Sequence, residues 1–255
     1  MITIKTKEEI AILREGGRRH ARLLRELADM AKPGVPVMDL ENYVREQIAK
    51  GGDKSPFLNY HIPGAKRPYP AALCVSINDE VVHGIPTEGD KILNEGDIVS
   101  LDLGITHGGL ITDAAITVPV GKISPELERL VRVTKEALMA GIKAAKGGKR
   151  VGDIGAAVER IGIANGYGIV EELVGHGVGY DVHEDPYVPN YGDAGTGAVL
   201  KPGMVIAIEP MFNLGGKEIE MSENGFAFRT ADGSPSAHFE HTVVITKGDA
   251  EILTR

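Results

Sequence analysis

The sequence predicts one α/β domain over residues 1–255, of the α+β kind, built as a pseudo-twofold repeat of helices and antiparallel strands. The order of the predicted elements is one observation, because two helices followed by strands occur in the first half and again in the second. Matching residue patterns in the two halves are another. The composition, 42% hydrophobic and 25% charged, is that of a globular chain long enough to bury a core without disulfides.

The first half begins with two predicted helices. Thr6-Lys7-Glu8-Glu9 matches a capping box, and the helix should run to about Ala31, where Lys32-Pro33-Gly34 ends it. A second helix is expected from Asp39 to Lys50, before two glycines, and the proline-rich stretch Pro56–Pro70 predicts a loop. Three strand-like runs follow, at Ala72–Ile77, Ile98–Leu103 and Leu110–Val118.

The second half predicts the same order. Ser124 followed by Pro125 is a good helix start, and that helix should reach about Lys146. Another helix is expected from about Asp153 to Ala164. Strands are predicted at Ile169–Leu173, Val205–Ile208 and Phe239–Thr246.

The repeat also aligns acidic residues. Ala31–Asp39 resembles the segment 114 positions later, Ala145–Asp153. The strand segments match as Gly96–Asp102 with Gly203–Glu209, and as Asp113–Val118 with Glu240–Ile245. Each half therefore carries a carboxylate at the same point of two strands. If the halves pack about a shared axis, all four carboxylates converge.

A glycine-rich segment, GHGVGYDVHEDP from Gly175 to Pro186, separates these strands. Its histidines, His176 and His183, are seven residues apart, which does not fit one helix face, and the glycines oppose helix formation. We expect an extended or looped segment that brings two imidazoles to one place. The GxGxG pattern is a weak dinucleotide-binding signal, which we reject because no helical pattern follows it.

Carboxylates buried together repel one another, so cations must offset them. The predicted ligand set is Asp102, Asp113, His176, Glu209 and Glu240. Oxygen-rich ligation with one imidazole suits Mn²⁺, Fe²⁺, Co²⁺ or Zn²⁺. Two such ions can lower the pKa of a water molecule and stabilise a tetrahedral intermediate, which is hydrolysis chemistry. A single Asp in a strand is more often an edge residue, but the repeat and the GHGVG segment together favour metal binding.

Further histidines fit the same site. His83, before Gly84 and Pro86, is either a turn residue or, with His183, a hydrogen-bond donor to the substrate and its developing oxyanion. His238 lies two residues before Glu240 on the same strand face, which suggests a supporting role.

Composition excludes several other functions. A formal charge of −8 and the absence of Trp argue against DNA binding and base stacking. Cys74 is the only cysteine, so no disulfide forms within the chain, as expected in the cytoplasm. No apolar run is long enough to span a membrane, and the charged N-terminus does not resemble a signal peptide. A monomer is expected, because no coiled-coil pattern occurs.

Five segments together carry a family resemblance: NDEVVHGIP, SLDLG with TDAAITV, GHGVGYDVHEDP, IAIEP and FEHTVVIT. They resemble the type I methionine aminopeptidases of the M24 metallopeptidases, over nearly the whole chain. The resemblance implies a pita-bread fold around a dimetal site, with Asp113 and Glu240 bridging the metals. It implies substrate binding by His83 and His183, and a proton-shuttle role for Glu209. It also implies removal of the initiator Met from nascent polypeptides with a small second residue.

The same resemblance implies a methionine pocket, formed by Tyr60, Tyr69, Cys74 and Phe226. Phe226 stands where the family often has Trp, and Val182 where a bulkier Phe is common. The segment HIPGAKRP, residues 61–68, is about six residues longer than the usual link.

Three alternatives follow from the same residues. One is an Xaa-Pro aminopeptidase or prolidase of the same fold. Another is a binding protein that has lost its metals, which the complete ligand set disfavours. The third adds ribosome docking to the enzyme activity, through basic stretches near Lys66 and Lys149.

Overall fold

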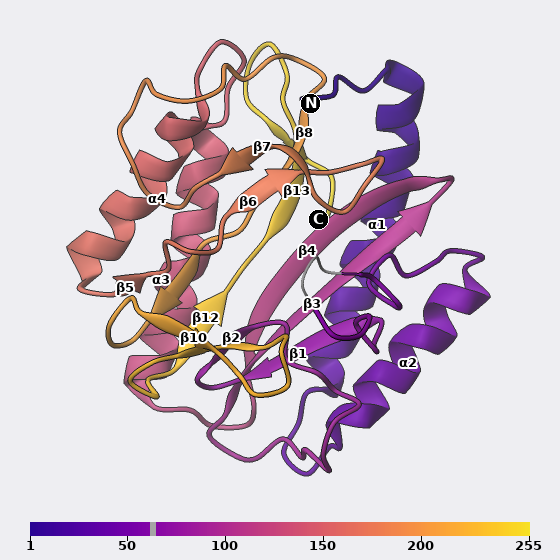
Figure 1. Cartoon of the computed structure of the whole chain (residues 1–255), viewed down its shortest axis with the longest axis vertical. Coiled ribbons are helices and arrows are strands. Elements are labelled where there is room, and N and C mark those ends of the chain that lie inside the picture. Colours follow the sequence, from indigo (N-terminus) through magenta and orange to yellow (C-terminus); the bar gives the residue numbers. More distant parts are fainter. Residues whose placement is uncertain (62–64) are drawn as a thin grey trace.

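The structure, a computed structural model, describes residues 1–61 and 65–255. Strands lie between two pairs of helices, with α1 and α2 on one side and α3 and α4 on the other (Figure 1). The helices are α1 (Lys7–Met30), α2 (Val37–Lys50), α3 (Pro125–Ala144) and α4 (Val151–Asn165). None of them, within the described ranges, has both the length and the apolar character to cross a membrane.

The strands form two larger sheets, one from each half of the chain. The first has the order β1-β3-β4, with β1 (Leu73–Ile77), β3 (Ile98–His107) and β4 (Leu110–Pro119). The second has the order β14-β13-β8-β6-β7, with β6 (Gly175–Gly177), β7 (Glu184–Val188), β8 (Val205–Ile208), β13 (His241–Val244) and β14 (Glu251–Ile252). Two small sheets contain β2 (Glu80–Val82), β5 (Gly168–Ile169), β9 (Met211–Asn213), β10 (Ile219–Met221), β11 (Phe228–Thr230) and β12 (Ser236–His238).

The helix starts follow the capping signals of the sequence. Thr6 accepts a hydrogen bond from the Glu9 amide, and the Glu9 carboxylate accepts one from the Thr6 amide. Ser124 caps α3 in the same way, with Pro125 in its first turn. The prediction that α2 begins at Asp39 was two residues late, because Pro36 sits at the N-cap with extended backbone and Val37 opens the helix.

The predicted repeat is visible in the turns after α1 and α3. Gly34 and Gly148 both have a φ of 85°, which favours glycine. The Gly34 amide donates to the Leu93 carbonyl at 2.8 Å, and the Gly148 amide donates to the Leu200 carbonyl at 2.9 Å. The same turn therefore joins the helices of each half and ties them to equivalent loops.

The two halves meet where β4 runs antiparallel to the chain entering β13. The amide of Glu240 donates to the Ala115 carbonyl at 2.9 Å. Thr242, two residues after Glu240, contacts Asp113, two residues before Ala115. Its hydroxyl accepts from the Asp113 amide at 2.8 Å and donates to the Asp113 carbonyl at 2.7 Å. This seam places a carboxylate of one half beside a carboxylate of the other.

Several predicted strand lengths were wrong. The strand expected at Ile169–Leu173 ends at Ile169, because the chain leaves the ladder and Leu173 lines a cavity. The strand expected to begin at Phe239 begins at His241, whereas β3 continues to His107 through its hairpin with β4. The predicted loop Pro56–Pro70 has no helix or strand among its described residues. Residues 62–64 of the longer 61–68 segment lie outside the described residues.

Candidate metal centre and substrate cavity

The first half contributes two aspartates from the β3–β4 hairpin. Asp102 pairs with Ala115 and Asp113 pairs with Gly104, so the two aspartates are diagonal neighbours on one face of the sheet. The glycine opposite Asp113 leaves room for the neighbouring Pro56. A Cβ at Gly104 would lie 2.5 Å from a ring carbon of Pro56, which packs over this face.

The second half contributes two glutamates at the ends of its strands. The β8–β13 ladder ends with Ile208 paired to His241, and Glu209 and Glu240 are the next residues on the two chains. The Asn190 side chain donates to the Glu209 carbonyl at 3.0 Å, which anchors the chain leaving β8. The short ladder therefore delivers both carboxylates to the edge that faces the first half.

His176 comes from β6, which packs closely against both of its neighbours. A Cβ at Gly175 would lie 2.4 Å from the Ala207 carbonyl oxygen, and one at Gly177 would lie 2.2 Å from that of Asp185. Nδ1 of His176 donates to the Gly177 carbonyl at 2.9 Å, so Nε2 keeps a free lone pair. The flanking glycines thus permit the close packing that fixes the imidazole.

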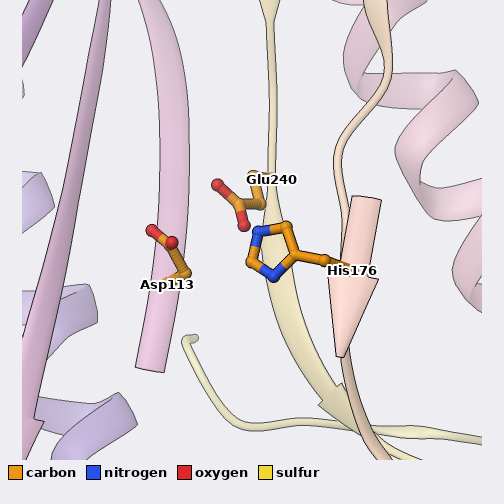
Figure 2. A group of neighbouring side chains, drawn as sticks. All are labelled: Asp113, His176 and Glu240. Atoms are coloured by element: carbon orange, nitrogen blue, oxygen red, sulfur yellow. The ribbon is translucent and has the colours of Figure 1, made fainter. Parts of the chain in front are cut away.

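Three predicted ligands form a tight group. Figure 2 shows the side chains of Asp113, His176 and Glu240 directed toward one another from three separate strand segments. One potential ligand atom from each lies within 4.8 Å of the others. Asp102 and Glu209 line the same cavity.

Two imidazoles contact Glu209. Its Oε1 lies 3.5 Å from Nε2 of His176, and its Oε2 lies 3.4 Å from Nε2 of His238. His238 is buried. The histidine expected to support the Glu240 segment therefore contacts the other glutamate of the second half.

The carboxylates differ in their pKa shifts. Burial, with repulsion from neighbouring carboxylates, raises the pKa values of Asp113 and Glu240 well above their usual range. Burial raises the pKa of Asp102 to about 7. Burial also acts to raise the pKa of Glu209, but His238 and His176 outweigh it and lower that pKa.

The cluster fits divalent cations. Oδ1 of Asp102, Oδ1 of Asp113 and Oε1 of Glu240 are buried without a hydrogen-bond partner among the described residues. Leaving several carboxylate oxygens buried and uncompensated is costly, and cations would pair them. Carboxylates with one neutral imidazole form a common ligand set for first-row divalent metals.

His183 and Tyr60 lie together at the cavity mouth. The Tyr60 hydroxyl is 3.0 Å from Nδ1 of His183, and the His183 ring centroid is 4.5 Å from that of His176. Partial burial and the neighbouring His176 lower the pKa of His183 to about 4, so its imidazole is neutral at pH 7.

His83 lines the same cavity from a strained backbone. Its φ is 60°, an unusual value for a residue other than glycine, and such strain is often found at functional sites. The next residue is Gly84, where a Cβ would lie 2.1 Å from the Val75 carbonyl oxygen. The close approach of these two segments holds His83 in place, and burial lowers its pKa.

The cavity has a volume of about 140 Å³. Tyr60, Tyr69 and Cys74 line it, as does Val182. Phe226 does not line the described cavity but backs it, with its ring edge-on to Tyr69 at a centroid distance of 5.5 Å. Sequence reasoning missed the apolar wall formed by Val82, Leu173 and Val174, although these residues directly precede the His83 and GHG motifs.

Comparison with known proteins agrees with this geometry. The sequence profile of metallopeptidase family M24 matches residues 11–247. This chain belongs to metallopeptidase family M24. It is 46% identical to the methionine aminopeptidase of Aquifex aeolicus, covering 99% of this chain and 98% of that protein. It is 42% identical to methionine aminopeptidase 1 of Bacillus subtilis, covering both chains completely.

Solved structures of M24 proteins confirm the predicted fold. The methionine aminopeptidase of Thermotoga maritima superposes with a TM-score of 0.95 at 44% identity, covering all of both chains. A prolidase from Pyrococcus furiosus superposes with a TM-score of 0.76 at 25% identity, covering 99% of this chain but only 65% of the prolidase. The chain is thus an M24 metallopeptidase with the pita-bread fold, and its metal-ligand cluster supports the use of divalent metal.

Proposed function

We propose that this M24 metallopeptidase is an aminopeptidase that removes N-terminal methionine, with a preference for a small second residue. The observation that carries the proposal is the position of the carboxylate and histidine cluster at an apolar cavity with a polar mouth. The full-length similarity to proteins named methionine aminopeptidase supports the same activity.

The proposed ligands are Asp102, Asp113, His176, Glu209 and Glu240, which would hold two divalent ions of Mn, Fe, Co or Zn. Such ions lower the pKa of a water molecule and polarise a carbonyl group. Asp113 and Glu240 lie at the seam between the halves, where they would hold the ions together with His176. The buried oxygens without partners support this assignment.

The remaining steps use side chains of the chain itself. The carboxylate of Asp102 attracts the amino terminus of the substrate. His183, with a neutral imidazole, donates a hydrogen bond to the scissile carbonyl oxygen, and His83 helps to hold the substrate backbone. Glu209 has a lowered pKa and is ionised at neutral pH, so it can accept a proton from the attacking water and pass it to the leaving amine.

The apolar wall supplies the methionine pocket. Tyr60, Tyr69 and Cys74 would contact the Met side chain directly, whereas Phe226 would act by supporting Tyr69. An apolar pocket discriminates by about 1–3 kcal/mol per methylene, so the smaller Val182 is compatible with a preference for Met. A cytoplasmic monomer acting on nascent chains completes the proposal. Ribosome docking near Lys66 and Lys149 stays an alternative that adds to it, and charge reversal at these lysines that left ribosome association unchanged would remove it.

The test measures release of free Met from Met-Ala-Ser, compared with Met-Leu-Ser and with an Ala-Pro dipeptide. The protein is stripped of metal and refilled with Mn²⁺, Co²⁺, Fe²⁺ or Zn²⁺ in turn. The proposal expects metal-dependent cleavage of Met-Ala-Ser alone. Cleavage of Ala-Pro would instead indicate a prolidase-type activity, and no cleavage with any metal would favour a binding protein.

A further inference from the structure

A buried lysine lies outside the metal cluster, in the segment before α1. The Lys5 side chain is 0% exposed, and its Nζ is 2.6 Å from Oε2 of Glu184, whose side chain is 6% exposed. Nζ also lies 4.4 Å from the centre of the Tyr180 ring. Burial lowers the pKa of Lys5 although Glu184 opposes the shift. A buried ion pair of this kind adds little net stability compared with apolar packing, so stability alone does not account for it.

Glu184 organises the loop that precedes it. Its Oε1 accepts hydrogen bonds from the amides of Tyr180 at 2.6 Å and Asp181 at 3.2 Å. Its Oε2 accepts from Lys5 and from the Thr3 hydroxyl at 2.5 Å. The carboxylate therefore closes residues 180–184 into a compact loop, and His183 is the residue directly before it.

Lys5 is itself held on both sides. Its amide donates to the Gly203 carbonyl at 2.8 Å, which ties the segment before α1 to the chain that enters β8. Its Cε packs over Gly179, where an added Cβ would lie 2.4 Å away and the φ is 141°. The last glycine of the GHGVG motif thus leaves room for the lysine chain.

We propose that Lys5 is a positioning residue for His183, which it orients by fixing Glu184 and the loop Tyr180–Glu184. His183 lies at the cavity mouth. Its contacts with Tyr60 and His176 depend on a fixed conformation of the loop Tyr180–Glu184. Small errors in the position of such a group reduce turnover strongly. The inference rests on the proposed role of His183 in binding the substrate.

A double-mutant cycle tests the inference. Lys5→Met keeps an unbranched chain and removes the charge, and it should lower kcat for Met-Ala-Ser about tenfold while metal content and KM change little. In a His183→Ala background the same substitution should change kcat by less than about twofold, because the group it positions is absent. Equal reductions in both backgrounds would show a general effect on the fold and overturn the inference.

Arg14→Met is the matched control. Arg14 pairs with Glu251 at 2.6 Å and joins α1 to β14, but neither residue lines the described cavity. The Arg14→Met substitution should leave kcat unchanged in both the wild-type and the His183→Ala backgrounds. If Lys5→Met yields no folded protein, Lys5→Gln provides a milder variant with a shorter side chain.

Amide hydrogen exchange gives a readout that does not depend on activity. Lys5→Met should accelerate exchange at Tyr180 and Asp181, the two amides bound by Glu184, whereas Arg14→Met should not. Unchanged exchange at these amides would overturn the inference. If His183→Ala alone left turnover unchanged, the proposed role of His183 would fail even where the exchange result held, so the two failures can be distinguished.

Discussion

The two halves of the molecule contribute equivalent carboxylates to the centre but place them in different surroundings. In the first half, Asp102 and Asp113 lie on two regular strands of ten residues each. In the second half, Glu209 and Glu240 lie at the ends of strands of only four residues. The strand beside the carboxylates, β1, carries no histidine in the first half, whereas β6 in the second half carries His176.

This difference decides the acid–base properties of equivalent residues. Asp102 and Glu209 occupy the same position of the repeat, yet burial raises the pKa of Asp102 to about 7, whereas His238 and His176 lower the pKa of Glu209. The repeat therefore explains why there are four carboxylates, two from each half. In Asp102 burial outweighs the effect of His238, whereas in Glu209 His238 and His176 together outweigh burial. A lowered pKa of Glu209 is what its proposed role as proton carrier requires.

The strongest test removes a carboxylate from the seam. Asp113→Asn should cause loss of one or both metal ions and lower kcat/KM by more than about 100-fold, because the amide carries no negative charge to hold the cations. Metal content by atomic emission, with turnover of Met-Ala-Ser, checks this. Full activity with two metals retained would refute the ligand assignment.

The equivalent positions can be compared directly. Glu209→Gln should lower kcat by about 10²-fold or more, because it removes the group proposed to carry the proton. Asp102→Asn should chiefly weaken metal binding, and excess metal should restore part of its activity. Metal titrations followed by kcat at saturating metal distinguish the two variants. Equal rescue of both variants by excess metal would mean that the contacts with His238 and His176 do not give Glu209 a role that Asp102 lacks.

The raised pKa values predict a pH dependence for the metal-free protein. Asp102, Asp113 and Glu240 hold their protons more tightly in the folded protein than in the unfolded chain, because burial raises their pKa values. Their contribution to stability is therefore full below about pH 4 and falls as the pH rises, and for Asp102 the fall ends near its folded pKa of about 7. His83 and His183 act in the opposite direction, because burial lowers their pKa values and their contribution to stability rises with pH up to the unfolded value of about 6.5. Above that pH the carboxylates dominate, so the Tm of metal-free protein should fall from pH 7 to pH 8. Added Mn²⁺ should reverse the fall at pH 8, and a flat profile without metal would contradict the buried, uncompensated cluster.

The smallest expected effects concern two threonines of the seam. Thr242 holds the backbone of Asp113, and the Thr117 hydroxyl holds His238 in the same way, accepting from its amide at 2.8 Å and donating to its carbonyl at 2.7 Å. Thr242→Val and Thr117→Val should each cost about 1–3 kcal/mol of unfolding free energy, since buried backbone groups lose their partners. Only Thr242→Val should also weaken metal affinity, by about tenfold, as measured by calorimetric titration. Equal metal affinities would show that the seam does not set the Asp113 position.

The sequence alone determined the family, the repeat and the four helices, and it predicted Asp113, His176 and Glu240, which the structure brings together. These are local signals, because caps, periodicity and repeated motifs can be read within short windows. Strand ends were less predictable, as the early end of β5 shows, since long-range pairing decides them.

Only the tertiary structure decided the environment of each residue. It placed Phe226 behind Tyr69, gave Asp102 and Glu209 opposite pKa shifts, and joined Lys5 to Glu184 across 179 positions of the chain. Burial and charge at a site depend on every segment that packs there. Residue types therefore predicted what the cluster contains, and packing between distant segments determined how each member behaves.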